Sequence, residues 1–221
     1  MDIRQFEFIK QKHGRHASWA LWADPAEKAK SNMGDMTIFD LAANPGLLEM
    51  LKTNVIMVGL NIASLSRLLS EPFRNFHDPN PRANDFKIRY AFRDTQYYGA
   101  YMTDIIKDVG MINSKDLLEH LKEYPALVEH NIESFREELR DLNCTEPTIL
   151  TFGAEAYKIV HDNLRCDEYS RLIKLTHYSH HINKETYKEA VLSQINLALN
   201  LWALDTASPT LAHRPRVFVV P

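Results

Sequence analysis

Short apolar segments that are typical of β-strands alternate along this chain with longer stretches of helical periodicity. The apolar segments span residues 54–60, 99–106, 148–152 and 172–176, and turn residues bound them. The first and third are continuously apolar, as expected for strands that are covered on both faces. Parallel strands need crossover connections, which helices supply. We therefore predict an α/β fold, a three-layer α/β/α sandwich with a central, mostly parallel four-stranded sheet.

Two segments have a clear helical pattern. In residues 125–142 the apolar positions step by four and three, which places them on one helix face. A second helix is expected after Asn183, which is a good N-cap residue. Further helices are expected at 154–163 and in parts of 37–51, whereas the proline-rich residues 73–84 predict a long loop.

The length of 221 residues and the 45% apolar content predict one folded domain. We assign residues 1–205 to that domain, with 1–53 as an N-terminal extension packed on it and 206–221 as a tail. Trp19 and Trp22 indicate a packed element within the extension. Two cysteines, the lack of a signal-like start and the lack of a membrane-spanning apolar run favour a cytoplasmic protein.

Polar residues follow the predicted strands, and ligands of α/β proteins bind at that edge of the sheet. Asn61 follows the first strand, Asp104 lies late in the second, Gly153 follows the third and His177 follows the fourth. Asn61 either holds a water or ligand through its amide oxygen or caps a helix. His177 is suited to donate a hydrogen bond, to act as an acid, or to bind a metal together with neighbouring histidines.

Five segments, in order, resemble motifs of the uracil-DNA glycosylase superfamily, closest to its mismatch-specific and single-strand-selective branches. They are VIMVGLNIAS, FHDPNPRANDF, GAYMTDIIK, REELRDLNCTEPTILTFGAEAYKIV and LTHYS. The resemblance runs from about residue 54 to about residue 200. It implies a cofactor-free, metal-free DNA-repair enzyme that flips a damaged or mismatched base out of DNA and hydrolyses its N-glycosidic bond.

The resemblance also assigns roles to residues. It implies that Asn61 holds the attacking water and that His177 donates a hydrogen bond to the departing base. The base-binding residues that it implies are Leu60, Phe76, Phe73 and Asp104. The DNA-binding residues that it implies are Ser179, His181, Ile182 and Lys184. Core packing is the alternative for both phenylalanines.

Three positions depart from the family's motifs. Ile62 and Tyr178 stand where the family has proline, so the backbone is less restricted there. Asp104 stands where the family often has an asparagine that reads uracil. An ionised aspartate only accepts hydrogen bonds, which suits a base that carries an amino group. Alternatively, a buried Asp104 is protonated, or it caps the following turn.

The net charge of −3 excludes a broadly basic surface but leaves room for a local DNA contact. Lys87, Arg89 and Arg93 follow the proline-rich loop and are candidates for that contact, with solubility as the alternative role. We expect a monomer that binds DNA and no membrane. Two other functions stay open: a catalytically silent protein that binds a base, nucleotide or protein partner, and a hydrolase with a metal on His177, His180 and His181.

Overall fold

A computed structural model describes residues 1–62, 71–107, 109–111 and 113–206. Five strands form one mixed sheet, in the order β1-β3-β2-β4-β5. The strands are β1 (Ser18–Trp19), β2 (Lys52–Asn61), β3 (Ala100–Ile106), β4 (Thr148–Phe152) and β5 (Arg171–Leu175). The four strands β2 to β5 run parallel, as predicted, and their bounds lie within a few residues of the predicted segments. The predicted number of strands was wrong, because β1 adds a fifth, antiparallel strand beside β3.

The added strand belongs to the N-terminal segment, and aromatic packing holds it in place. Trp19 is fully buried and lies edge-on to Tyr101 of β3, with ring centroids 5.1 Å apart. Trp22 is buried as well, and its indole N–H donates to the carbonyl of Phe76. Both tryptophans are therefore packed, Trp19 within the edge strand β1 and Trp22 in the segment that follows it.

The helices occupy the positions that the periodicity predicts, with some additions. They are α1 (Ile3–Lys12), α2 (Leu47–Met50), α4 (Phe86–Phe92), α5 (Ser114–Glu123), α6 (Pro125–Asp141), α7 (Ala154–Asn163) and α8 (Lys184–Thr206). The predictions for α6, α7 and the start of α8 are confirmed. Within residues 37–51 only the single turn α2 and part of a 3-10 turn form. Residues 73–84 contain no helix or strand, as predicted.

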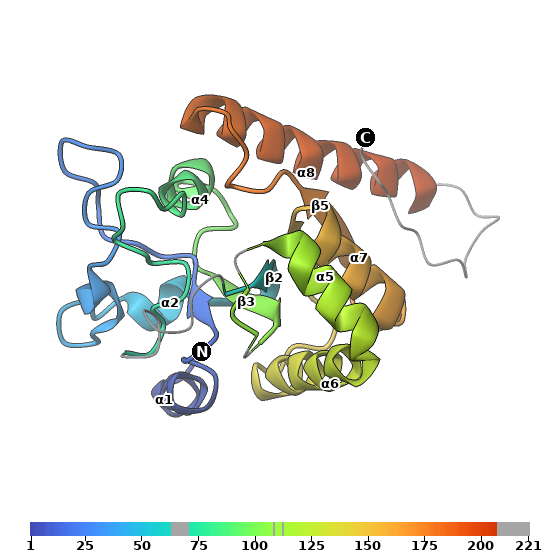
Figure 1. Cartoon of the computed structure of the whole chain (residues 1–221). Helices are drawn as coiled ribbons and strands as arrows, with labels where there is room; N and C mark the ends of the chain where they lie inside the picture. Colours follow the sequence, from blue (N-terminus) through green and yellow to red (C-terminus); the bar gives the residue numbers. More distant parts are fainter. Residues whose placement is uncertain (63–70, 108, 112, 207–221) are drawn as a thin grey trace.

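Helices cover both faces of the sheet (Figure 1). Alternate residues of β2 point to opposite faces, so Ile56 and Val58 join one core cluster and Val55 and Met57 join the other. The first cluster contains side chains of α1, α5, α6 and α7, and the second contains those of α4 and α8. No helix among the described residues is long and apolar enough to cross a membrane.

This topology fixes where a ligand site can form. Because β2 to β5 are parallel, their carboxyl ends meet at one edge of the sheet, where Asn61 lies beside Ile106 and Gly59 beside Asp104. The chain leaves β5 at this same edge before α8 begins. The residues that follow the parallel strands are thereby brought together.

Candidate active site

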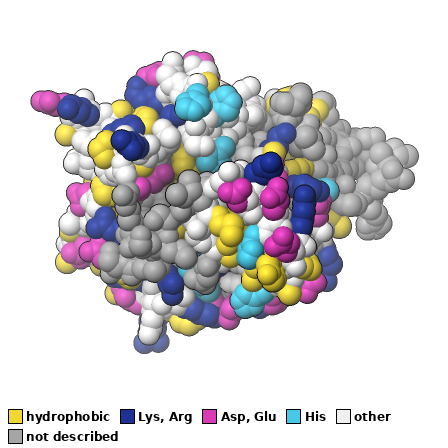
Figure 2. All heavy atoms as spheres, in the orientation of Figure 1, with side chains coloured by type: hydrophobic (Ala, Val, Ile, Leu, Met, Phe, Trp, Pro, Cys, Tyr) yellow, Lys and Arg dark blue, Asp and Glu magenta, His cyan; other side chains and the backbone are white. Residues whose placement is uncertain are grey.

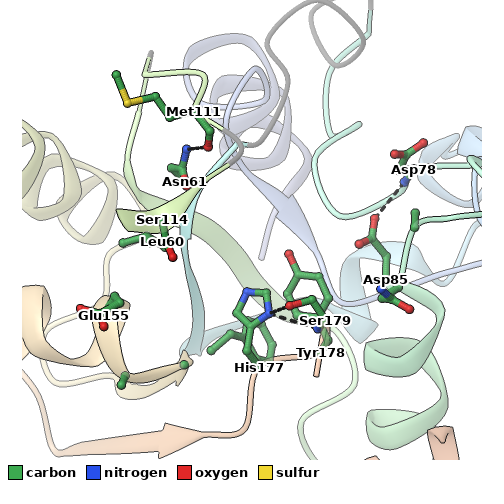
Figure 3. Close-up of a pocket in the computed structure, with 15 residues that line it drawn as sticks. Leu60, Asn61, Asp78, Asp85, Met111, Ser114, Glu155, His177, Tyr178 and Ser179 are labelled. Atoms are coloured by element: carbon green, nitrogen blue, oxygen red, sulfur yellow. Dashed lines mark hydrogen bonds between the residues drawn. The ribbon is translucent and has the colours of Figure 1, made fainter. Parts of the chain in front are cut away.

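A pocket with a volume of about 560 Å³ lies at the carboxyl ends of β2, β4 and β5 (Figure 3). We call it the strand-end pocket. It is lined by Leu60, Asn61, Asp78, Ala83, Asn84, Asp85, Met111, Ser114, Phe152, Gly153, Ala154, Glu155, His177, Tyr178 and Ser179. Six of the residues that the sequence singled out therefore share one cavity: Leu60, Asn61, Gly153, His177, Tyr178 and Ser179.

Asn61 is held by main-chain carbonyl groups. Its amide nitrogen donates to the carbonyl oxygens of Met111 at 2.8 Å, Val109 at 3.0 Å and Ile62 at 3.3 Å. The bond to Met111 is visible in Figure 3. Because the two polar atoms of an amide diverge from the same carbon, these bonds turn the amide oxygen away from the loop. Asn61 thus offers an oriented acceptor, which can position a water but is too weak a base to deprotonate it.

His177 is fixed by the residue two positions further on. Its Nδ1 lies 3.1 Å from the Ser179 backbone nitrogen, which donates to it, and 2.7 Å from the Ser179 hydroxyl (Figure 3). With Nδ1 as the acceptor of that N–H, the proton of the neutral ring sits on Nε2. Burial lowers the pKa of His177 to about 4, so the imidazole is neutral at physiological pH. The side chain is therefore a hydrogen-bond donor through Nε2.

Aromatic rings set the position of His177, and a glycine lies beside it. Its ring stacks on that of Tyr178, with centroids 4.3 Å apart, and Tyr178 meets the edge of Phe152 at 5.4 Å. Gly153 follows β4 with a φ of +91°, a conformation that favours glycine. A Cβ on Gly153 would lie 3.4 Å from the His177 ring, an ordinary van der Waals contact, so the positive φ is what favours glycine there.

Phe76 and Asp104 lie next to β2 but do not line the strand-end pocket. A Cβ on Gly59 would be 2.2 Å from the Asp104 carboxylate and 3.3 Å from the Phe76 ring, so both side chains press directly on the strand. Asp104 accepts a hydrogen bond of 2.8 Å from the Asn75 amide. Burial raises the pKa of Asp104 to about 7, against the opposing effect of that bond. Both residues are 3% exposed and form a covered layer beneath Gly59.

Phe73 lies in the other core cluster. Its ring packs against Phe6 at 5.7 Å and Phe39 at 5.3 Å, and it is fully buried. Phe73 and Phe76 both have φ near +65°, a strained region for bulky side chains. The loop that carries them is therefore held by its packing, with Phe73 and Phe76 anchored on opposite sides of the sheet.

The acidic side chains that line the pocket on two sides were not anticipated from the sequence. Asp78 and Asp85 border it on one side, and Glu155 of α7 borders it on another (Figure 3). The Asp85 carboxylate accepts a hydrogen bond of 3.0 Å from the Asp78 backbone N–H. Burial raises the pKa of Asp85 to about 6. The one available signal was that Asp85 lies inside the segment FHDPNPRANDF, which also supplies Phe76.

The remaining predicted DNA contacts lie in the segment after the pocket. His181 is exposed, Ile182 is half-buried against the core, and Lys184 lies over the Tyr90 ring at 4.6 Å while pairing with Glu185. None of these three side chains lines the strand-end pocket. They follow His177 closely in the chain, and their role as DNA contacts stays a prediction.

All three predicted cations have structural partners, and Arg93 pairs with Asp24 at 2.7 Å. Arg89 is buried and donates to the carbonyl oxygens of Ala23, Ala29 and Ser31. Lys87 is buried too and donates to the His180 carbonyl at 2.8 Å. On the face shown in Figure 2, basic and acidic side chains are interspersed.

The described residues contain no group of three or more His, Cys, Asp or Glu side chains that is arranged to hold a metal ion. Comparisons of the chain with protein-family models, with curated proteins and with solved structures gave no match. The geometry of the strand-end pocket and the motifs of the sequence are therefore the features that point to a function.

Proposed function

We propose that this protein is a monofunctional DNA glycosylase that hydrolyses the N-glycosidic bond of a flipped-out, damaged or mismatched base. The observation that carries the proposal is that Asn61 and His177, 116 positions apart in the chain, line one pocket. One presents an oriented acceptor and the other an oriented neutral donor. The order of the resembling motifs and the parallel sheet are consistent with a uracil-DNA glycosylase-like arrangement.

The proposed reaction uses these two groups on opposite sides of the bond that breaks. As the bond between the sugar C1′ and the base nitrogen breaks, its electron pair moves into the base. His177 Nε2–H donates to an acceptor of the base, a carbonyl oxygen or a ring nitrogen, and stabilises the growing negative charge. The Asn61 amide oxygen accepts a hydrogen bond from a water and directs its oxygen to C1′, which is oxocarbenium-like at that stage. The water adds to C1′ and releases a proton, and the departing base ends up protonated.

The direct test is the formation of abasic sites in labelled oligonucleotides that carry different modified or mismatched bases, as single and double strands. Removing one preorganised donor costs roughly 100-fold to 1,000-fold in rate. We expect losses of that size for His177→Ala and for Asn61→Ala. His180→Ala is the matched control, because that histidine lies in the same segment but its side chain does not line the pocket. Variants that all cleave like the wild type would refute the proposal.

A catalytically silent binding protein is the second candidate. The feature that favours it is Tyr178, whose ring stacks on His177 at a position where the resembling family has proline. This candidate predicts saturable binding of a base or nucleoside that depends on Asn61 and His177 without any abasic product. The oligonucleotide assay therefore separates the two functions.

A further inference from the structure

We propose that Asp85 determines the specificity of the strand-end pocket and selects a base that carries an exocyclic amino group over its oxo counterpart. The inference deepens the proposed function and rests on it for the DNA context. It starts from the charge of the pocket wall. Asp78, Asp85 and Glu155 line the pocket, whereas no lysine or arginine does so among the described residues.

Asp104 is excluded from this role by its position. Its carboxylate is turned toward Gly59 and is bound by Asn75, beneath the strand, and it does not line the pocket. Asp85 does line the pocket, with 8% of its surface exposed. An acceptor carboxylate therefore faces the ligand space, but from the start of α4 and not from β3.

The hydrogen bonds that the Asp85 carboxylate accepts show which further donor it can take. The backbone N–H groups of Asp78 and of Asp85 itself donate to the carboxylate, and no side-chain donor to it occurs among the described residues. A ligand carbonyl at this wall would meet an oxygen and be repelled, while an amino group would supply the missing donor. Leaving a buried polar group unpaired is costly, so a site of this kind discriminates strongly against the wrong partner.

His177 sets the complementary requirement. Its Nε2–H needs an acceptor on the ligand, so the preferred heterocycle carries both an acceptor and an amino donor. Cytosine-type and adenine-type bases meet both conditions, whereas uracil and hypoxanthine have a carbonyl group in place of the amino group. The two pairs are matched probes, because each differs in that one substituent and the accompanying ring proton.

The experiment measures binding without requiring hydrolysis. Deoxycytidine against deoxyuridine, and deoxyadenosine against deoxyinosine, are titrated into the full-length protein and followed by protein-observed NMR. We expect the amino member to bind at least tenfold more tightly in each pair. In Asp85→Asn, whose amide keeps an acceptor for Asp78 N–H and adds a donor, we expect that preference to vanish or reverse. Glu155→Gln, an isosteric change at another wall of the same pocket, should keep the preference.

A second measurement needs no variant. N4,N4-dimethyl-deoxycytidine keeps the acceptor groups but has no N–H on its exocyclic nitrogen, and we expect it to bind at least tenfold more weakly than deoxycytidine. Equal binding within both nucleoside pairs, or a preference that survives Asp85→Asn, would overturn the assignment. The outcomes also separate the two proposals: selective binding without abasic product refutes only the hydrolysis, and abasic product without amino selectivity refutes only the role of Asp85.

Discussion

The rings of His177 and Tyr178 stack on each other, although adjacent residues in an extended chain point to opposite sides. The stack is possible because the chain leaves β5 at this point and turns back through the Ser179 N–H bond to His177. Tyr178 thereby becomes a support for the donor imidazole and also a wall of the pocket.

This support can be tested by substitution at Tyr178. Phenylalanine keeps the ring, so we expect Tyr178→Phe to retain His177 in place and to change activity less than threefold. Alanine removes a contact that is worth about 0.5–1.5 kcal/mol for an aromatic pair, so we expect Tyr178→Ala to lower the rate of base release by roughly tenfold. Single-turnover kinetics measure the rates, and thermal unfolding checks that both variants are folded. Equal rates for the two variants would contradict the supporting role.

The protonation state of His177 gives a second prediction. Because burial lowers its pKa to about 4, the ring stays neutral throughout the physiological range. Long-range ¹⁵N-coupled NMR at pH 7 should show a neutral imidazole with its proton on Nε2, and titration should show the ring charging only below about pH 5. A proton on Nδ1, or a midpoint near the ordinary histidine value, would contradict the donor role.

Asp104 predicts how stability depends on pH. Its folded-state pKa of about 7 lies above the ordinary value of 3.8, so the folded protein binds more protons between these values. The stability from this group is fully present below pH 3.8 and is lost as the pH rises through 7. As the pH rises from 4 to 8, we expect the free energy of unfolding of Asp104→Asn to increase relative to that of the wild type by roughly 2–4 kcal/mol. Denaturant unfolding measures the difference, and a difference that stays constant with pH would refute the shift.

Gly59 provides a prediction about packing. A Cβ there would lie 2.2 Å from the Asp104 carboxylate, so we expect Gly59→Ala to destabilise the protein by about 1–3 kcal/mol. Gly46→Ala is the control, because nothing lies within 4 Å of a Cβ at that position. If the clash is the cause, Gly59→Ala and Asp104→Ala together cost less than the sum of the single changes. Strict additivity in this double-mutant cycle would place the cause elsewhere.

Much of the framework follows from local sequence patterns. Residues 148–152 and 154–163 form a strand and a helix with the predicted bounds, and 125–142 differs by one residue at its end. These segments have strong periodicity and clear end signals. The strand β1 was missed because it is two residues long and forms only through the packing of Trp19 on β3.

The site was partly predictable for a related reason. Asn61 ends β2 and His177 follows β5, and the parallel sheet brings strand ends together whatever the details of the loops. Asp85 reaches the pocket through the path of a loop, which has no local signature, whereas Glu155 lies in the first turn of a helix whose start was predicted but whose side chain was not assigned to the site. Phe73 and Phe76 are three positions apart in one loop but lie in separate core clusters, a distinction that sequence spacing does not contain.

The anchoring of Asn61 has a consequence for how distant relatives can be found. The groups that hold its amide, at positions 109 and 111, are main-chain carbonyls, which every amino acid possesses. Evolution is free to exchange the side chains there while the orientation of the amide is preserved. A search for invariant residues would overlook these carbonyl groups, whereas a comparison of backbone paths after the second parallel strand would detect them.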